Sequence, residues 1–231
     1  MNTARRSLAI AVLIAAAGFS FQARAGIWLK VTKGALTEKA NGSATPGLAR
    51  FDGTIGNFTV SVDTGVGFPV AGSRTDPVLD LTSLDVTSKK KGGTLKVLLT
   101  ETGFKTISAG DQFISRIVGN YVNSDATLTT YLDTANIPFG KETLLSSDLI
   151  DNQMGTALAP EFTGRYSLTE IVTITAGAKS LTSLDALVDD SRVVDAPEPA
   201  SLSLLGVALA GFGLLRRRRA AANRQRGLAP G

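Results

Sequence analysis

Residues 166–175 read YSLTEIVTIT, and this stretch is the clearest sign of the fold. Every second residue from Tyr166 to Ile174 is apolar except Glu170, so an extended chain directs this set of side chains to one face. The residues between them are mostly serine and threonine, and threonine is common in strands. A period of two predicts a half-buried β-strand rather than a helix.

The same alternation recurs along the chain on both sides of this stretch. Apolar and polar residues alternate at 57–63, at 94–100 and at 128–132. Turn-forming pairs such as Asn41-Gly42 and Gly92-Gly93 separate the runs. Within residues 81–86 the apolar residues change parity, which predicts a β-bulge near Ser83.

These patterns predict an all-β domain over residues 26–190, built as an antiparallel two-sheet β-sandwich of the jelly-roll or immunoglobulin-like kind. We expect about eight to eleven strands, the first formed by AGIWLKVTK at residues 25–33. The pentapeptide Leu-Thr-Ser-Leu-Asp occurs at 81–85 and again at 181–185. Because the residues flanking the two copies differ, we attribute the repetition to chance.

The composition lowers the expectation of an enzyme. The 231-residue chain contains neither cysteine nor histidine. It therefore lacks thiolate nucleophiles, the commonest general base and the commonest transition-metal ligand. We predict no catalytic residue, no metal site and no cofactor.

The formal net charge of +4 comes from the two ends of the chain. Nine of the 24 basic residues lie before Gly26 or after Ala196, and the residues between them carry 15 Lys or Arg against 19 Asp or Glu. The central part of the chain is therefore mildly acidic, and nucleic-acid binding is not expected of it.

Residues 1–25 have the three-part pattern of a secretory signal peptide, which we expect to form a helix. Two arginines, Arg5 and Arg6, precede an apolar run at 8–18. A site of the A-x-A type follows, where a signal peptidase cleaves. The residues of this cleavage site are Ala23, Ala25 and Gly26.

The other end combines a linker, a short apolar run and a basic tail. We predict a linker at 191–199, a transmembrane helix at 200–215 and a basic cytoplasmic tail at 216–231. The apolar run would be about 24 Å long at about 1.5 Å per residue, which is short for a bilayer core of about 30 Å. The span residues are Ser201, Leu202, Leu204, Leu205, Val207, Leu209, Phe212, Leu214 and Leu215, and the stop-transfer residues are Arg216, Arg217, Arg218 and Arg219.

Pro197, Glu198 and Pro199, followed by this span and the four arginines, resemble the PEP-CTERM sorting signal of Gram-negative bacteria. The resemblance implies recognition by exosortase, a protease embedded in the inner membrane. It also implies export, transient anchoring through the C-terminal helix, and final location at the cell surface or in the extracellular matrix. The family is associated with exopolysaccharide and biofilm. Phrases such as YLDTANIPFG and YSLTEIVTIT are similar to those of the β-rich ectodomains that precede such tails.

Two groups of carboxylates are candidates for chemistry, and each has a simpler interpretation. Asp185, Asp189, Asp190 and Asp195 could bind Ca²⁺, but they lack the spacing of a calcium loop, and a solvated linker explains them better. Asp76, Asp80 and Asp85 flank a strand. On a regular strand Asp80 and Asp85 would face opposite ways, which argues against paired-carboxylate catalysis.

Lysines and aromatic residues are candidates for polysaccharide binding. Lys89, Lys90 and Lys91 could contact an acidic polysaccharide, but they are more simply a solvated hairpin loop. The aromatic residues that could stack on sugar rings are Trp28, Tyr121, Tyr131 and Tyr166. Because Trp28 lies in an apolar segment, we favour core packing for it.

Three alternative functions are consistent with these observations. The favoured one is an exported structural protein of the envelope or extracellular matrix, sorted by its tail and associated with exopolysaccharide. The second is a carbohydrate-binding module of the same matrix, which an exposed row of aromatic residues on one sheet would favour. The third is a secreted hydrolase, which needs two carboxylates that converge in a cleft.

Overall fold

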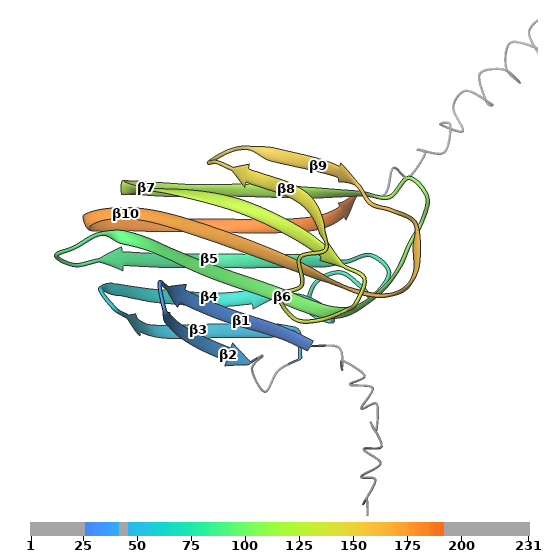
Figure 1. The fold of residues 1–231 in the computed structure, drawn as a ribbon, viewed down its shortest axis with the longest axis horizontal. Coiled ribbons are helices and arrows are strands. Elements are labelled where there is room, and N and C mark those ends of the chain that lie inside the picture. The colour runs from blue at the N-terminus through green and yellow to red at the C-terminus, as the bar shows by residue number, and fades with distance from the viewer. Residues whose placement is uncertain (1–25, 42–45, 192–231) are drawn as a thin grey trace, which may run out of the picture. The chain divides into compact units, whose positions relative to one another are not determined.

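Two long strands, β7 (Gln112–Asp133) and β10 (Phe162–Ser191), organise the computed structural model, which describes residues 26–41 and 46–191 (Figure 1). Both strands are long because the alternation of YSLTEIVTIT continues on either side of it and is matched along β7. The remaining strands are β1 (Gly26–Lys33), β2 (Leu36–Asn41), β3 (Leu48–Ile55), β4 (Phe58–Val66), β5 (Val78–Ser88), β6 (Gly93–Ile107), β8 (Thr143–Leu149) and β9 (Met154–Leu158).

All ten strands belong to one antiparallel sheet, in the order β2-β1-β6-β10-β5-β4-β3. β7 lies off this path and pairs with β10, β8 and β9. The prediction of an all-β antiparallel domain is confirmed, and the described residues contain no helix. We expected two separate sheets, whereas the described strands form a single hydrogen-bonded sheet.

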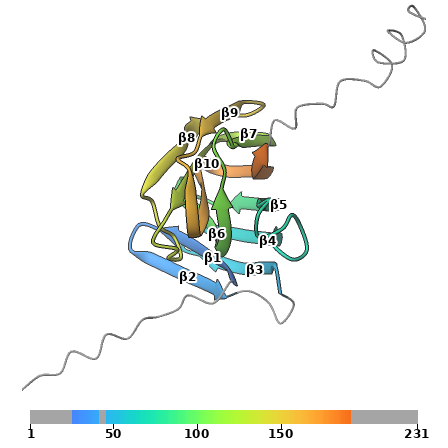
Figure 2. The same ribbon diagram turned by 90° about the vertical axis from the view of Figure 1, so that its right-hand side faces the viewer.

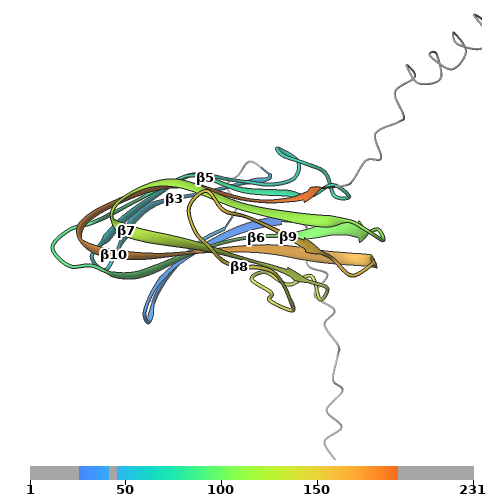
Figure 3. The same ribbon diagram turned by 90° about the horizontal axis from the view of Figure 1, so that it is seen from above.

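The sheet is continuous because β10 pairs with a different neighbour along each part of its length. Residues 162–176 pair with β6, and residues 181–189 pair with β5. β7 accompanies β10 on both sides of the change, so neither strand ends where the sheet bends. Figure 3 shows β7 and β10 curving from one layer into the other.

We call the two parts of the folded sheet the first half and the second half. The first half contains β1, β2, β6, β8, residues 162–176 of β10 and residues 124–133 of β7. The second half contains β3, β4, β5, β9, residues 181–191 of β10 and residues 112–122 of β7. Figure 2 shows these groups of strands facing each other.

Polar side chains hold the chain at the bend. Asn123 in β7 and Lys179 in β10 have positive φ angles of 52° and 56°, and the Asn123 amide donates to the carbonyl of Ala178 at 2.7 Å. The hydroxyl of Ser88, the last residue of β5, donates to the carbonyl of Gly177 at 2.6 Å. The same hydroxyl accepts the backbone N–H of Ser180 at 3.1 Å. Such bonds compensate the positive φ angles, which cost free energy in residues other than glycine.

The core lies between the two halves. The apolar set at alternate positions of β10, including Tyr166, faces inward as predicted. The Tyr166 ring contacts Phe104 of β6 at a centroid distance of 5.7 Å and Phe113 of β7 at 6.3 Å, the second contact edge to face. Both halves thus contribute to one aromatic cluster, and burial of apolar area supplies the main driving force for the folded sheet.

The predicted bulge at Ser83 is present. Ser83 has a φ angle of 55°, and the β5–β10 register shifts between Leu184 and Ala186. The Asp185 carboxylate accepts the backbone N–H of Ser83 at 2.6 Å, which satisfies a donor that the bulge removes from the ladder. The two Leu-Thr-Ser-Leu-Asp copies are neighbours here, since Leu84 lies opposite Leu184.

Several sequence predictions lie outside the described residues. They are the signal peptide at 1–25 and the parts of the chain from 192 onward, with the sorting motif, the apolar span and the arginines. Asp195 lies there too. Among residues 26–41 and 46–191, no helix is long and apolar enough to cross a membrane.

The bend predicts a measurable role for Ser88, whose side chain is buried. Replacing Ser88 with Ala removes the hydroxyl from the Gly177 carbonyl and from the Ser180 N–H, so unfolding free energy should fall by about 1–3 kcal/mol. Denaturant titration of the purified protein measures the difference. Thr87→Ala, at the exposed preceding position, should change it by no more than about 0.5 kcal/mol. Equal effects of the two substitutions would contradict this role for Ser88.

Candidate ligand-binding surface

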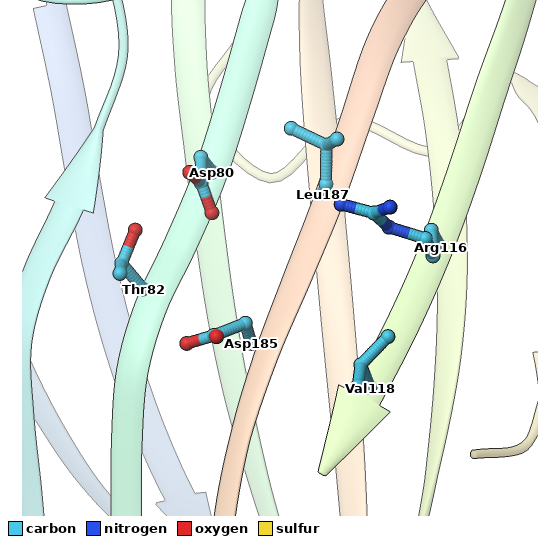
Figure 4. A pocket seen from close by; sticks show the side chains of 6 residues that line it. All are labelled: Asp80, Thr82, Arg116, Val118, Asp185 and Leu187. Atoms are coloured by element: carbon cyan, nitrogen blue, oxygen red, sulfur yellow. The ribbon is translucent and has the colours of Figure 1, made fainter. Parts of the chain in front are cut away.

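The bulge at Ser83 corrects the expected orientation of the carboxylates in β5. Without the bulge, Asp80 and Asp85 would face opposite ways. The extra residue at the bulge reverses the alternation, so both side chains lie on the outward face of the second half. Asp80 and Thr82 of β5, Asp185 and Leu187 of β10, and Arg116 and Val118 of β7 line a shallow pocket of about 340 Å³. Figure 4 shows the Asp185 carboxylate directed toward β5 and the Arg116 guanidinium extending toward β10.

Burial and neighbouring groups act on the Asp80 carboxyl of this pocket. Burial raises the pKa of Asp80, and the charge of Asp185 adds to the effect, while the Thr82 hydroxyl and Arg116 act in the opposite direction. Asp185 is already engaged by the Ser83 N–H. The pocket therefore brings two carboxylates and a guanidinium together on the outer face of the sheet, with one carboxylate already bonded to the backbone.

Two further carboxyl groups are buried between the halves. Glu101 of β6 is 2% exposed and Glu170 of β10 is 0% exposed. Burial raises the pKa of Glu101 to about 8, although the backbone N–H of Phe68, which donates to Glu101 Oε2 at 3.0 Å, and the charge of Arg74 act against it.

Glu170 occupies the polar position that interrupts the YSLTEIVTIT pattern. Burial holds the pKa of Glu170 well above its ordinary range, and the charge of Asp80 adds to it, whereas the Val188 backbone acts in the opposite direction. Neither Glu170 oxygen has a hydrogen bond of normal geometry in the structure. Both Glu101 and Glu170 are therefore expected to be protonated, uncharged core groups near neutral pH.

Strand β10 directs the acidic side chains near the end of the domain to different faces of the sheet. Asp185 and Asp189 point outward, whereas Asp190 is buried on the opposite face. Asp189 and Asp190 thus lie in a strand rather than in the solvated linker that we expected. No group of three or more acidic side chains in the described part of the chain is arranged to hold a metal ion.

The aromatic residues divide between the core and the outer face of the first half. Tyr166 is buried, and Tyr121 packs at the edge of the core. Trp28 alternates with the buried Ile27 and Leu29, so it faces outward and is half-buried, contrary to the core packing that we favoured. Tyr131 also faces outward.

Trp28 and Tyr131 belong to one row across four strands. Trp28 in β1 lies opposite Thr100 in β6, Thr100 lies opposite Thr169 in β10, and Thr169 lies opposite Tyr131 in β7. The two threonines are buried and hydrogen-bonded to each other at 2.9 Å. The middle of the row therefore consists of two buried threonines, and an aromatic ring lies at each end.

The connection between β7 and β8, residues 134–142, covers these two threonines. The Thr100 hydroxyl accepts the Phe139 N–H at 3.3 Å, and the Ser167 hydroxyl donates to the Ile137 carbonyl at 2.9 Å. At the base of the connection, the Glu142 carboxylate accepts the Thr134 N–H at 2.7 Å. The connection is thus bonded both to the sheet below it and across its own ends.

Phe139 has a φ angle of 62°, which is unusual for a bulky residue. Asn136 has a φ of 56°, and its side-chain carbonyl accepts the Gly103 N–H at 2.7 Å. A Cβ atom at Gly140 would overlap the carboxylate of Asp133, so this position requires glycine. Backbone strain that the surroundings enforce is typical of functional sites.

Two lysines lie over aromatic rings at this connection. The Lys30 ammonium lies 4.1 Å from the Phe139 ring centroid, and the Lys141 ammonium lies 5.6 Å from that of Tyr131. Lys39 of β2 lies opposite Lys30 in the sheet. Burial lowers the pKa of Lys30, and the charges of Lys141 and Lys39 lower it further.

We call this set the lysine–aromatic surface, and it consists of Trp28, Lys30, Lys39, Tyr131, Phe139 and Lys141. Sequence reasoning singled out its two outer rings but missed its lysines and Phe139. The phrase YLDTANIPFG was the one available signal, since it carries Tyr131 and Phe139. Lys89, Lys90 and Lys91, which we considered instead, are exposed in the connection between β5 and β6.

Comparison with known proteins identifies the tail of the chain. Residues 195–219 match the family described as the PEP-CTERM protein-sorting motif, so the chain carries this sorting signal. No curated protein matches the sequence.

Solved structures with partial similarity include carbohydrate-binding proteins. TmCBM61 in complex with β-1,4-galactotriose is 12% identical over 56% of this chain and 86% of its own, with a TM-score of 0.29. A family 6 carbohydrate-binding module is 15% identical over 60% and 86%, with a TM-score of 0.22. The enzymatically active domain of bacteriophage CBA120 tailspike protein 4 is 12% identical over 60% and 20%, with a TM-score of 0.29. Scores this low do not indicate a ligand or a reaction for this protein.

Glu101 predicts a pH dependence of stability. Its carboxyl ionises near its ordinary pKa of 4.5 in the unfolded chain, but near 8 in the folded protein. Between these values the folded state binds more protons, so stability should fall as pH rises, by up to about 1.4 kcal/mol per pH unit. Glu101→Gln should flatten this slope in denaturant titrations between about pH 5 and about pH 8. Glu161→Gln, an exposed control, should keep it. A Glu101→Gln variant with the wild-type slope would refute this assignment.

Proposed function

We propose that the protein is an exported structural component of the cell envelope or extracellular matrix, which exosortase sorts through its C-terminal signal. The observation that carries the proposal is the PEP-CTERM motif at residues 195–219. The motif follows an all-β domain whose last strand ends at Ser191. In this proposal the signal peptide at 1–25 starts export, and the apolar span at 200–215 holds the protein transiently in the inner membrane.

The proposal assigns no catalysis to the folded domain. The chain has no histidine or cysteine, and the carboxyl groups of the domain are either buried in the core or spread over an open face. Association with exopolysaccharide and biofilm is the role that fits a sorted protein of this kind. After removal of the tail, the acidic domain would remain at the cell surface or in the polymer around it.

A carbohydrate-binding module of the same matrix is the second candidate function. The outward orientation of Trp28 and Tyr131 favours it, because rings at both ends of one row can stack on sugar rings. Affinity electrophoresis tests it: the native exopolysaccharide in the gel should retard the protein, and an equal mobility with and without polymer would exclude this function.

Sorting predicts a change in the mass of the protein. Intact-mass analysis of protein from the native host should show loss of the hydrophobic tail only when exosortase is present, because the protease acts at the PEP-CTERM signal. In a strain without the protease the tail, with Arg216 to Arg219, should remain. A tail retained in both strains would contradict sorting and leave a simple membrane anchor.

A further inference from the structure

We infer that the lysine–aromatic surface binds an anionic polysaccharide. The inference deepens the proposed matrix function, on which it rests, by naming the binding surface and the charge of the polymer. It distinguishes the outer face of the first half from the rest of a domain that is acidic overall.

Three lysines of this surface carry positive charge without an ion pair among the described residues. Lys39 lies opposite Lys30 in the sheet, and burial together with the charges of Lys141 and Lys39 lowers the pKa of Lys30, so both lysines repel the Lys30 ammonium in the folded protein. None of the three forms an ion pair with the residues that the structure describes. Ammonium groups that lie on one face without an ion pair attract an anion, and an anionic ligand would relieve the repulsion of Lys30 by its neighbours.

Aromatic rings lie on the same surface as these charges. Lys30 lies over Phe139 and Lys141 lies over Tyr131, while the half-buried Trp28 faces the same side of β1 as Lys30. A sugar unit presents an apolar face that packs on such rings, and an acidic sugar also presents a carboxylate for the lysines. A simple inorganic anion would use the lysines and leave the rings without a role.

The connection that carries Phe139 and Lys141 is held rigidly on the sheet. Residues 134–142 are bonded to the buried Thr100 and Ser167, and Phe139 is held at a positive φ. A preorganised surface loses little conformational entropy when it binds, which matters for a flexible polymer that makes only a few contacts per site. The row from Trp28 to Tyr131 crosses four strands, so at about 4.8 Å between strands its ends lie about 14 Å apart. Residues 134–142 cover the middle of this row, so sugar units would meet Trp28 and Tyr131 on either side of the connection.

The lysines also argue for a polyanion rather than a neutral glycan. Removing ammonium groups from water to contact a neutral polymer would bring no compensating charge. A repeating acid along the polymer meets several ammonium groups at once, and linked weak contacts of this kind reinforce one another.

Binding to two soluble polymers tests the inference. Mature protein released from the native host is titrated with alginate, a polymer of uronic acids, and with dextran, a neutral polymer, at low ionic strength. We expect binding to alginate that weakens with added salt and much weaker binding to dextran. Equal affinity for the two polymers would overturn the inference of an anionic ligand.

Matched variants then test the surface. The triple variant Lys30→Gln, Lys39→Gln and Lys141→Gln should bind alginate more weakly by on the order of 10-fold, because three charge contacts are lost. The control variant Lys89→Gln, Lys90→Gln and Lys91→Gln removes the same charge from the exposed β5–β6 connection and should retain most of the affinity. Equal losses in the two variants would show unspecific attraction and overturn the assigned surface. Unfolding midpoints of all variants establish that the fold is intact.

Other occupants of the surface give different results. Binding to vesicles of anionic phospholipid but not to alginate, or lysine-dependent self-association in sedimentation experiments without binding to alginate, would overturn the inference in favour of a membrane or a second copy. Each of these outcomes leaves the mass change of the tail unaffected, so failure of this inference and failure of the sorting proposal are distinguishable.

Discussion

The continuous pairing of β7 with β10 across the bend is the constraint on which the rest of the structure depends. Each strand changes layer without interrupting their shared ladder, apart from the irregularity between Ala176 and Leu181. β5, β6, β8 and β9 pair directly with this pair of strands, and β1 with β2 and β4 with β3 extend the sheet outward from β6 and β5. The core, the two outer faces and the positions of all candidate groups follow from where the pair bends. Ser88 and Asn123 are therefore important although they contribute little apolar area.

The fold also separates the charges of the domain. The outward face of the second half carries carboxylates, with Asp80, Asp85 and Asp185 close to its centre. The outward face of the first half carries Lys30, Lys39 and Lys141 around Phe139. A net charge calculated for the whole domain hides this arrangement, because the two sets of charges lie on opposite outer surfaces of one folded sheet.

Local alternation was sufficient to predict strands, the orientation of the YSLTEIVTIT side chains and the bulge at Ser83, since these depend on near neighbours in sequence. It was not sufficient for the bend, because nothing local distinguishes a strand that ends from one that continues into another layer. Trp28 was misplaced because its apolar ring was given more weight than its parity, which it shares with the polar Lys30 and Thr32. The prediction that Asp80 and Asp85 face opposite ways holds for a regular strand, but the bulge at Ser83 places both on the same face. The approach of Lys30 to Lys141 depends on contacts between residues more than 100 positions apart.

The position of β10 has a mechanical consequence. The chain leaves the described domain at Ser191, the last residue of this strand. A pull on the polypeptide beyond Ser191 is first felt by β10, which is bonded on one side to β7 and on the other to β5 in its last third. Where the pull runs along the strand, both ladders are sheared and many bonds share the load, whereas a pull across the strand would open them one after another. The domain is thus attached to its tail through a strand that is paired on both sides.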